Sequence, residues 1–406
     1  MDGMEMPIII QQPKDDFAGV DFGDIRLNKR LQIIVENSTK NAEKSILGSG
    51  EGRSEAKAAY RLLGNERFDI NQLQNCATRK TMARMKGTVL LIQDTSDVNL
   101  NGHKKTKGLG YCSEHVLGIK LHSCIAISPE GLPYGLVYQT YETRQEPKSS
   151  LTKAEKAARP IEEKESFRWI DTLRNATATA PEGVHFITIC DREGDFYELY
   201  AEAKKLEEDF IIRVTHDRCS DNDEKIMAQI HRTKAVGTVT VNIPRDSRTG
   251  SPARQSEMEV AYCQVNVRRP ENVRDEEIAP NLAMNLVRIT ELAPPDGSDP
   301  IEWILATSLS LSDASEAMTV VKHYIQRWKI ERFHFVLKSG MGAEKIQQRT
   351  YDRIKPLLFI YSVIALYIMA IAYAGRILPV LPCTCLFNED EWKILYSLVH
   401  KKNRAE

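Results

Sequence analysis

The chain has few of the features that mark secreted, disulfide-linked or zinc-binding proteins. Its eight cysteines are scattered over 406 residues, and only Cys383 and Cys385 lie close together. No cluster of histidines accompanies this pair, so the pattern does not match the ligand spacing of a structural zinc site. The apolar patch at residues 7–10 is too short for a signal peptide. We therefore expect reduced thiols and a cytoplasmic protein.

Long hydrophobic runs are also scarce, with one exception near the C-terminus. Residues 357–374 form a stretch of 18 uncharged residues between Lys355 and Arg376, which is the nominal length of a membrane span. The stretch contains Ser362 and three tyrosines, and the sequence has no second run of this kind. We interpret it as the buried helix of a large core, with a membrane span as the alternative.

The chain lacks a net charge of either sign, because 55 basic side chains balance 56 acidic ones. The distribution of charge is more informative than its sum. Residues 25–88 carry 13 Lys and Arg against six Asp and Glu, whereas residues 1–24 carry one Lys and six acids. Asp24 followed by Leu27 and Leu31 at helical spacing predicts the first of three short helices in the basic segment. Clustered cations on short helices suit a DNA-contacting unit, but this pattern taken alone slightly favours an ordinary helical cap with a solvated face.

Apolar runs predict a mixed α/β order through the middle of the chain. Residues 89–94 and 185–191 each form a short apolar strand that ends in an aspartate. Residues 116–128 and 132–140 predict paired strands, and a helix is predicted at residues 167–177. The predicted parts are an N-terminal helical DNA-binding domain (1–87), an α/β catalytic core (88–218 and 300–380), a β-strand insertion (219–299) and a short C-terminal helical tail (381–406).

One segment of the core combines charge with helical spacing. Tyr324, Arg327, Glu331 and Lys338 follow one another at steps of 3, 4 and 7 residues, which places them on one face of a continuous helix. A carboxylate, two cations and a phenol make a poor core face. We expect this face to lie on a surface that binds a metal ion through the acid and a phosphate through the cations.

The two strand-end aspartates, Asp94 and Asp191, can meet Glu331 in space although 97 positions separate the first two. Hard oxygen ligands of this kind suit Mg²⁺ or Mn²⁺, and two such ions can support phosphoryl transfer without a covalent nucleophile. Asp97 lies three residues beyond Asp94 and should point to the opposite face of an extended strand. Asp195 also lies near Asp191, but the intervening glycine favours the first acid as the ligand. The alternative for each acid is a solvated surface charge.

The spacing Tyr-x2-Arg-x3-Glu-x6-Lys, with two aspartates upstream, resembles the motif of bacterial cut-and-paste DDE transposases of the insertion-sequence-four family. The likeness runs from about residue 24 to about residue 375. It includes Ala59-Tyr60-Arg61, Gln93-Asp94-Thr95, Cys190-Asp191-Arg192-Glu193, Phe210-Ile211-Ile212-Arg213, Trp303 and residues 327–334.

This resemblance implies a fold and a set of roles. The fold is an RNase H-like core, a mixed sheet flanked by helices, with a β-strand insertion before the glutamate helix and an N-terminal end-binding domain. The catalytic and metal-binding triad falls on Asp94, Asp191 and Glu331, with Mg²⁺ or Mn²⁺, two ions in all, as the cofactor. The remaining roles concern DNA: Tyr324, Arg327 and Lys338 hold a terminal phosphate, Arg213 contacts DNA, Trp303 receives a flipped base, and Arg26 and Arg30 bind the transposon end.

The predicted function is therefore cut-and-paste DNA transposition, by strand nicking, hairpin formation and resolution, and strand transfer. The expected partners are double-stranded transposon ends, target DNA and a second copy of the chain in a synaptic complex. The expected location is the bacterial cytoplasm beside the nucleoid, with no membrane as a partner. A structure-selective nuclease on the same core and a non-catalytic DNA-binding regulator derived from a transposase are the alternatives. A core indole is the alternative for Trp303.

Overall fold

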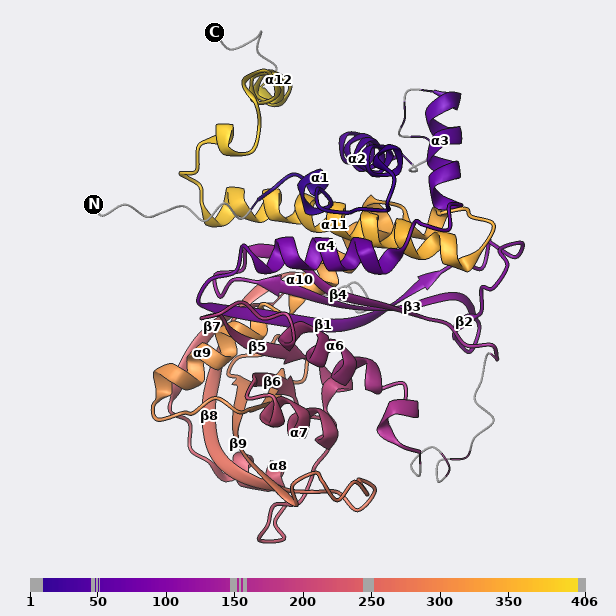
Figure 1. Cartoon of the computed structure of the whole chain (residues 1–406). Helices are drawn as coiled ribbons and strands as arrows, with labels where there is room; N and C mark the ends of the chain where they lie inside the picture. Colours follow the sequence, from indigo (N-terminus) through magenta and orange to yellow (C-terminus); the bar gives the residue numbers. More distant parts are fainter. Residues whose placement is uncertain are drawn as a thin grey trace.

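The computed structural model describes residues 10–44, 48, 50, 52–146, 152, 155, 159–243 and 252–400. Residues 1–9 of the predicted N-terminal domain and residues 401–406 of the predicted tail lie outside this part. The described chain forms one ten-stranded mixed sheet with helices on its faces (Figure 1). The predicted mixed α/β class is thus confirmed.

The sheet is organised around β1 (Thr88–Asn99). On one side β1 pairs antiparallel with β3 (Val116–Ile127), which pairs antiparallel with β4 (Pro133–Glu142). On the other side β1 pairs parallel with β5 (His185–Cys190), and β5 pairs parallel with β6 (Asp209–Arg213). Parallel neighbours place their carboxyl ends at the same edge of the sheet, and this edge carries the acids described below.

The strands that follow extend the same sheet beyond β6. They are β10 (Glu302–Thr307), β9 (Asn281–Glu291), β8 (Arg254–Arg268) and β7 (Gly237–Ile243), in that spatial order and all antiparallel. A short strand, β2 (Tyr111–Ser113), pairs with the start of β3. The β-rich segment is therefore continuous with the central sheet through β10.

The N-terminal helices pack above the sheet together with the long helix α11 (Figure 1). They are α1 (Pro13–Asp16), α2 (Ile25–Lys40), α3 (Arg53–Leu63) and α4 (Ile70–Met82). Asp24 caps α2 by accepting a hydrogen bond from the backbone N–H of Arg26, as its position before the apolar periodicity predicts. Leu31 and Ile34 of α2 are buried, so the predicted apolar face is the one that packs.

The remaining helices cover both faces of the sheet and the C-terminal end. They are α6 (Phe167–Thr177), α7 (Tyr197–Lys205), α8 (Ile226–Arg232), α9 (Ala314–Ile325), α10 (Trp328–Phe335), α11 (Tyr351–Ile377) and α12 (Glu389–His400). Helix α6 has the bounds that its sequence pattern predicts. Trp169 and Leu173 of α6 are buried in a second hydrophobic cluster beside β5 and β6.

The predicted apolar helix near the C-terminus is α11, and among the described helices it is the one long and apolar enough to cross a membrane. In its most apolar window, 72% of the residues are buried inside the protein. Its central serine, Ser362, donates a hydrogen bond to Leu358 O and contacts Gln139 of β4. This packing supports the interpretation of α11 as a core helix.

Two local predictions were wrong. Strand β1 does not end at Asp94 but continues to Asn99, because it leaves β5 at Ile92 and stays paired with β3. The predicted continuous helix around Glu331 is broken at Gln326 and Arg327, between α9 and α10. It then changes to a π-helical turn at Val336–Gly340, so the face that carries Lys338 is rotated from the predicted stripe.

Candidate active site

Asp94 and Asp191 lie at the same level on neighbouring parallel strands. Ile92 of β1 and Ile189 of β5 form the last pair between these two strands. Each aspartate lies two positions beyond that pair in its own strand. Asp94 continues in strand geometry, and one of its oxygens accepts a hydrogen bond from the Thr95 N–H at 2.7 Å. Asp191 begins a turn at Arg192–Gly194 and accepts from the Glu193 N–H at 2.8 Å. Local hydrogen bonds thus fix both carboxylates at one edge of the sheet.

Glu331 reaches this edge from α10, and Arg327 lies between the acids. The Arg327 guanidinium donates to Glu331 at 2.7 Å, and its other terminal nitrogen lies 4.0 Å from Asp94. Arg327 is 7% exposed, and its Nε has no partner within the described residues. A buried guanidinium between two carboxylates acts as their counter-ion.

The pKa of Asp94 shows that the three acids share one electrostatic site. Burial, as the largest cause, and the charges of Asp191 and Glu331 together raise it to about 7, against the opposing effects of Arg327 and the Thr95 N–H. The carboxylates are therefore close enough to repel one another. Such a site favours any cation that can neutralise it.

The oxygen-only donors Asp94, Asp191 and Glu331 fit a hard divalent cation such as Mg²⁺ or Mn²⁺. Within the described residues, no group of three or more His, Cys, Asp or Glu side chains is arranged so that it could hold a metal ion. Arg327 lies 2.7 Å from Glu331 and 4.0 Å from Asp94. The side chains fit a metal by chemistry and charge, with Arg327 in the counter-ion position.

Half of the predicted phosphate stripe is buried, which corrects its expected surface position: Tyr324 and Arg327 are buried, whereas Lys338 is half-buried and Glu331 is exposed. Tyr324 is 2% exposed, and its hydroxyl interacts with the guanidinium groups of Arg327 and Arg213. Burial raises the pKa of Tyr324, while the two arginines oppose the rise. The body of α9 packs on the sheet, so the phenol enters the core and only its hydroxyl faces the charged edge. Lys338, half-buried in the π-helical turn, lies beside His334, whose pKa falls to about 3 through burial and the lysine charge.

Trp303 of β10 lies beneath Arg213, whose guanidinium is 5.8 Å from the indole ring. The indole also makes an edge contact with Tyr324 at 5.7 Å between ring centroids. It is 6% exposed, so a flipped base would reach its face only after Arg213 moved aside. The proposed base-receiving role of Trp303 stays a prediction.

Arg26 and Arg30 lie one turn apart on α2, far along the chain from the acids. The Arg26 side chain is largely exposed and pairs with Asp24 at 2.7 Å. Arg30 is half-buried. Their predicted contact with a transposon end also stays a prediction.

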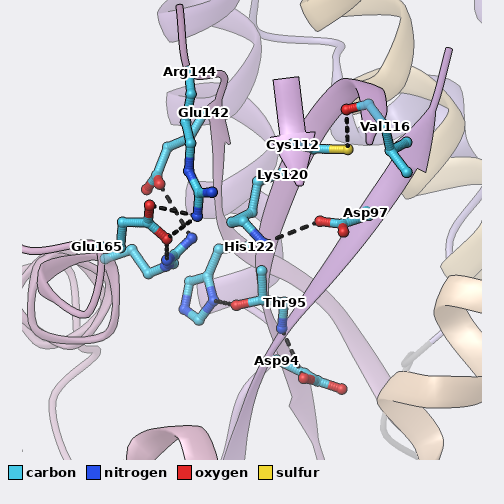
Figure 2. Close-up of polar contacts among 11 residues, drawn as sticks. Asp94, Thr95, Asp97, Cys112, Val116, Lys120, His122, Glu142, Arg144 and Glu165 are labelled. Carbon is cyan, nitrogen blue, oxygen red and sulfur yellow. Dashed lines mark hydrogen bonds and ion pairs between the residues drawn. The ribbon is translucent and has the colours of Figure 1, made fainter. Parts of the chain in front are cut away.

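The opposite face of β1 holds a polar network that the sequence reasoning missed (Figure 2). His122 of β3 lies 2.9 Å from the Thr95 hydroxyl and 3.2 Å from Gln93 Oε1, and its ring packs against Trp169. Burial lowers its pKa well below the usual value, so the ring is neutral. Because Gln93 Oε1 only accepts, the His122 Nε2–H donates to it and Nδ1 accepts from Thr95. This network supports β1 directly behind Asp94, and the two-residue alternation of the strand is the signal that would have found it.

The competing acids have structural partners. Asp97 pairs with Lys120 at 3.1 Å on the face opposite Asp94, as strand alternation predicts (Figure 2). Asp195 is fully buried and accepts hydrogen bonds from the Tyr200 hydroxyl and the backbone N–H groups of Thr215 and His216. It fixes the loop after β6 and has no free oxygen for a ligand at the edge.

A mixed sheet that brings two strand aspartates, a helix glutamate and a buried arginine to one edge defines a carboxylate-centred α/β enzyme domain. Residues 86–368 match the Transposase DDE domain family, and residues 13–68 match the Transposase DNA-binding family. The chain therefore belongs to the DDE transposases, and this family implies an RNase H-like core.

One similar solved chain comes from the cryo-EM structure of a piggyBac transposase synaptic complex with hairpin DNA. It shares 8% sequence identity, and the match covers 78% of the present chain and 54% of that chain, with a TM-score of 0.35. The present chain thus spans about half the length of that transposase, and a likeness at this score carries no argument.

Proposed function

We propose that this chain is a cut-and-paste DNA transposase of the insertion-sequence-four family, resembling the transposase of the composite kanamycin-resistance transposon. The observation that carries the proposal is the meeting of Asp94, Asp191 and Glu331 around Arg327 inside a Transposase DDE domain. The adjacent Transposase DNA-binding segment supplies a means of holding the DNA that this site would cut.

Asp94, Asp191 and Glu331 would hold two Mg²⁺ or Mn²⁺ ions, the class of cofactor that DDE domains use. Bound divalent ions supply activation of an attacking water or hydroxyl and stabilisation of the departing oxygen. The protein's own task is placement. Arg327 donates a planar pair of N–H groups suited to a phosphate, and Arg213 and Lys338 add positive charge. The Tyr324 hydroxyl orients the two arginines.

Each chemical step is a phosphoryl transfer at this one site. In the first, a water oxygen bonds to the phosphorus at the transposon end, the bond from phosphorus to the 3′-oxygen breaks, and a 3′-hydroxyl is released. That hydroxyl attacks the phosphorus of the opposite strand, the bond from this phosphorus to the 3′-oxygen of the flanking DNA breaks, and a hairpin results. Water then attacks the hairpin phosphorus and releases the 3′-hydroxyl again. This hydroxyl attacks a phosphorus of target DNA and displaces a target 3′-oxygen, which leaves as a hydroxyl.

This sequence of steps needs two ends held together. We therefore propose a homodimer in a synaptic complex with double-stranded transposon ends and target DNA, located in the cytoplasm beside the nucleoid. The basic face of α2, with Arg26 and Arg30, is the proposed contact with the end sequence.

The direct test is incubation of the protein with Mg²⁺ and a duplex carrying the sequences that flank its own reading frame. Hairpinned or joined products, resolved on denaturing gels, are the expected result. Linear cuts without hairpins or joints would instead identify a structure-selective nuclease. An equal product yield from the Glu331→Ala variant would reject catalysis by this site and favour a DNA-binding regulator.

A further inference from the structure

The connection between β1 and β2 presents lysines at the tip of a tight turn. The Thr106 N–H donates to the His103 carbonyl at 2.9 Å, so Lys104 and Lys105 occupy the two central positions of a β-turn. Both side chains are exposed, as is that of Lys107 just beyond the turn. No assigned role in the active site uses these three cations.

The loop is fixed to the segment that leads into α11. The Lys107 N–H donates to the Arg349 carbonyl at 2.9 Å, and the Tyr351 N–H donates back to the Lys107 carbonyl at the same distance. The Thr106 hydroxyl donates to the Gln348 carbonyl at 2.8 Å. These bonds form a parallel bridge between residues 242 or more positions apart, and they place Arg349 beside the lysines.

The same place joins the two family segments of the chain. Tyr60 of α3 belongs to the segment that matches the Transposase DNA-binding family. Its ring lies 5.6 Å from the Arg349 guanidinium and 5.3 Å from the Arg353 guanidinium, both within the DDE segment. Cation–π contacts therefore hold α3 against the start of α11 and fix the direction of both arginines.

These cations have no acidic partner among the residues that the structure describes. In the described part of the chain, none of Lys104, Lys105, Lys107, Arg349 or Arg353 forms an ion pair with a carboxylate. The acids nearest Arg349 and Arg353 in sequence have partners elsewhere, since Asp352 pairs with Lys355 and Glu344 accepts from the Asn99 N–H. Five cations on segments that these contacts hold together, without carboxylate partners among the described residues, attract a polyanion.

We propose that these five side chains, here called the basic bridge, bind the backbone of duplex DNA between the end-binding helices and the active site. The inference rests on the proposed function. It adds a DNA contact surface outside the acid site and outside α2.

The position of the basic bridge sets where along the DNA it acts. Asn99, at the end of β1 beside Glu344, lies five residues from Asp94, or about 17 Å at the rise of a strand. One DNA strand advances about 3.4 Å per nucleotide. The basic bridge would therefore contact phosphates about five or more nucleotides from the one that is cut.

The experiment compares two adjacent lysine pairs. Lys104→Ala/Lys105→Ala removes the turn tip, and Lys204→Ala/Lys205→Ala removes an exposed pair from α7, which lies on the other side of the sheet (Figure 1). Affinity for a duplex carrying the flanking sequences is measured by fluorescence anisotropy over a range of salt. Loss of two phosphate contacts flattens the slope of log affinity against log salt by about 2 for the first variant and not for the second.

A second arm localises the contact. Neutral methylphosphonate linkages placed about five to eight nucleotides from the cut site should weaken binding by the wild type more than binding by the Lys104→Ala/Lys105→Ala variant, which keeps three of the five cations. Equal slopes for both lysine variants, with wild-type protein that binds DNA, overturn the basic bridge alone. Absence of salt-dependent binding by the wild type overturns the proposed function itself.

Discussion

Arg327 contacts Glu331 at 2.7 Å and approaches Asp94 at 4.0 Å in the free protein, so it neutralises the acids that would hold a metal. A guanidinium in this place opposes the entry of a divalent cation by direct repulsion. The same group is the predicted phosphate ligand. Metal and DNA binding are thus coupled through one side chain, because phosphate contact would draw the guanidinium away from the acids.

Arg327→Ala should raise the affinity for Mn²⁺ in the absence of DNA by about tenfold or more, since one unit of nearby positive charge is removed. Isothermal titration calorimetry measures this without any catalytic step. Arg332→Ala, on the exposed side of the same helix, is the control and should leave Mn²⁺ affinity unchanged. Unchanged or weaker Mn²⁺ binding by Arg327→Ala would contradict the counter-ion role.

Asp94 and Asp97 provide a matched pair of neighbouring acids on opposite faces of β1. Asp94→Asn should lower strand cleavage by at least about 100-fold, because the charge that would hold the divalent ion is lost. Asp97→Asn should stay within about threefold of wild type, since its carboxylate pairs with Lys120 away from the site. The measurement is the rate of cleavage of the duplex that carries the flanking sequences. An equal loss of cleavage rate in the two variants would contradict the distinct role of Asp94.

At the level of elements, the β-rich segment is held by a buried carboxylate. Glu291 of β9 accepts hydrogen bonds from Arg254, from the Ser256 hydroxyl at 2.6 Å and from the Ile301 N–H at 3.2 Å. These bonds lower its pKa to about 2, with the Arg254 bond as the largest cause. The ionised form of Glu291 therefore stabilises the junction of β8, β9 and β10.

Glu291→Gln should lower the free energy of unfolding at pH 7 by about 1–3 kcal/mol. The contribution is fully present above the unfolded pKa of about 4.5 and is lost as pH falls toward the folded value of about 2. The stability difference between variant and wild type should therefore shrink below pH 4.5 in urea titrations. Glu276→Gln, on the exposed turn between β8 and β9, is the control. A stability difference between Glu291→Gln and wild type that grows as the pH falls would contradict the stabilising role of ionised Glu291.

At the scale of the whole molecule, α11 links the N-terminal helices to the sheet. It contacts α1, α2, α4 and α10 as well as β4, and its buried residues belong to the largest hydrophobic cluster. The segment that has membrane-spanning length is thus the central helix of a shared core. This position ties the folding of the Transposase DNA-binding segment to that of the DDE segment.

Leu358→Ala, at a fully buried site on α11, should destabilise the protein by about 2–5 kcal/mol through lost burial and a residual cavity. Val380→Ala, whose side chain is almost fully exposed, should change stability by less than about 0.5 kcal/mol. Chemical denaturation without detergent measures both. Equal stability of the two variants would show that α11 is not packed in the core.

Much of the local structure could be predicted from the sequence because it depends on neighbours in the chain. The cap at Asp24, the bounds of α6 and the opposite directions of Asp94 and Asp97 follow from hydrogen bonding and periodicity within a few residues. The site residues themselves stay predictions, although the pKa of Asp94 shows that all three acids interact.

Local patterns in the chain are enough to predict many of the strands and helices, the spacing of the motif residues and the two aspartates that follow apolar runs. Three features emerge only in the folded chain: β1 continues past Asp94, the helix breaks at Gln326 and Arg327, and Arg327 lies buried between acids. These features depend on pairing with β3 and on the packing of α9 and α10 against the sheet. Contacts between residues far apart in the chain set their energies, and no local pattern encodes those contacts.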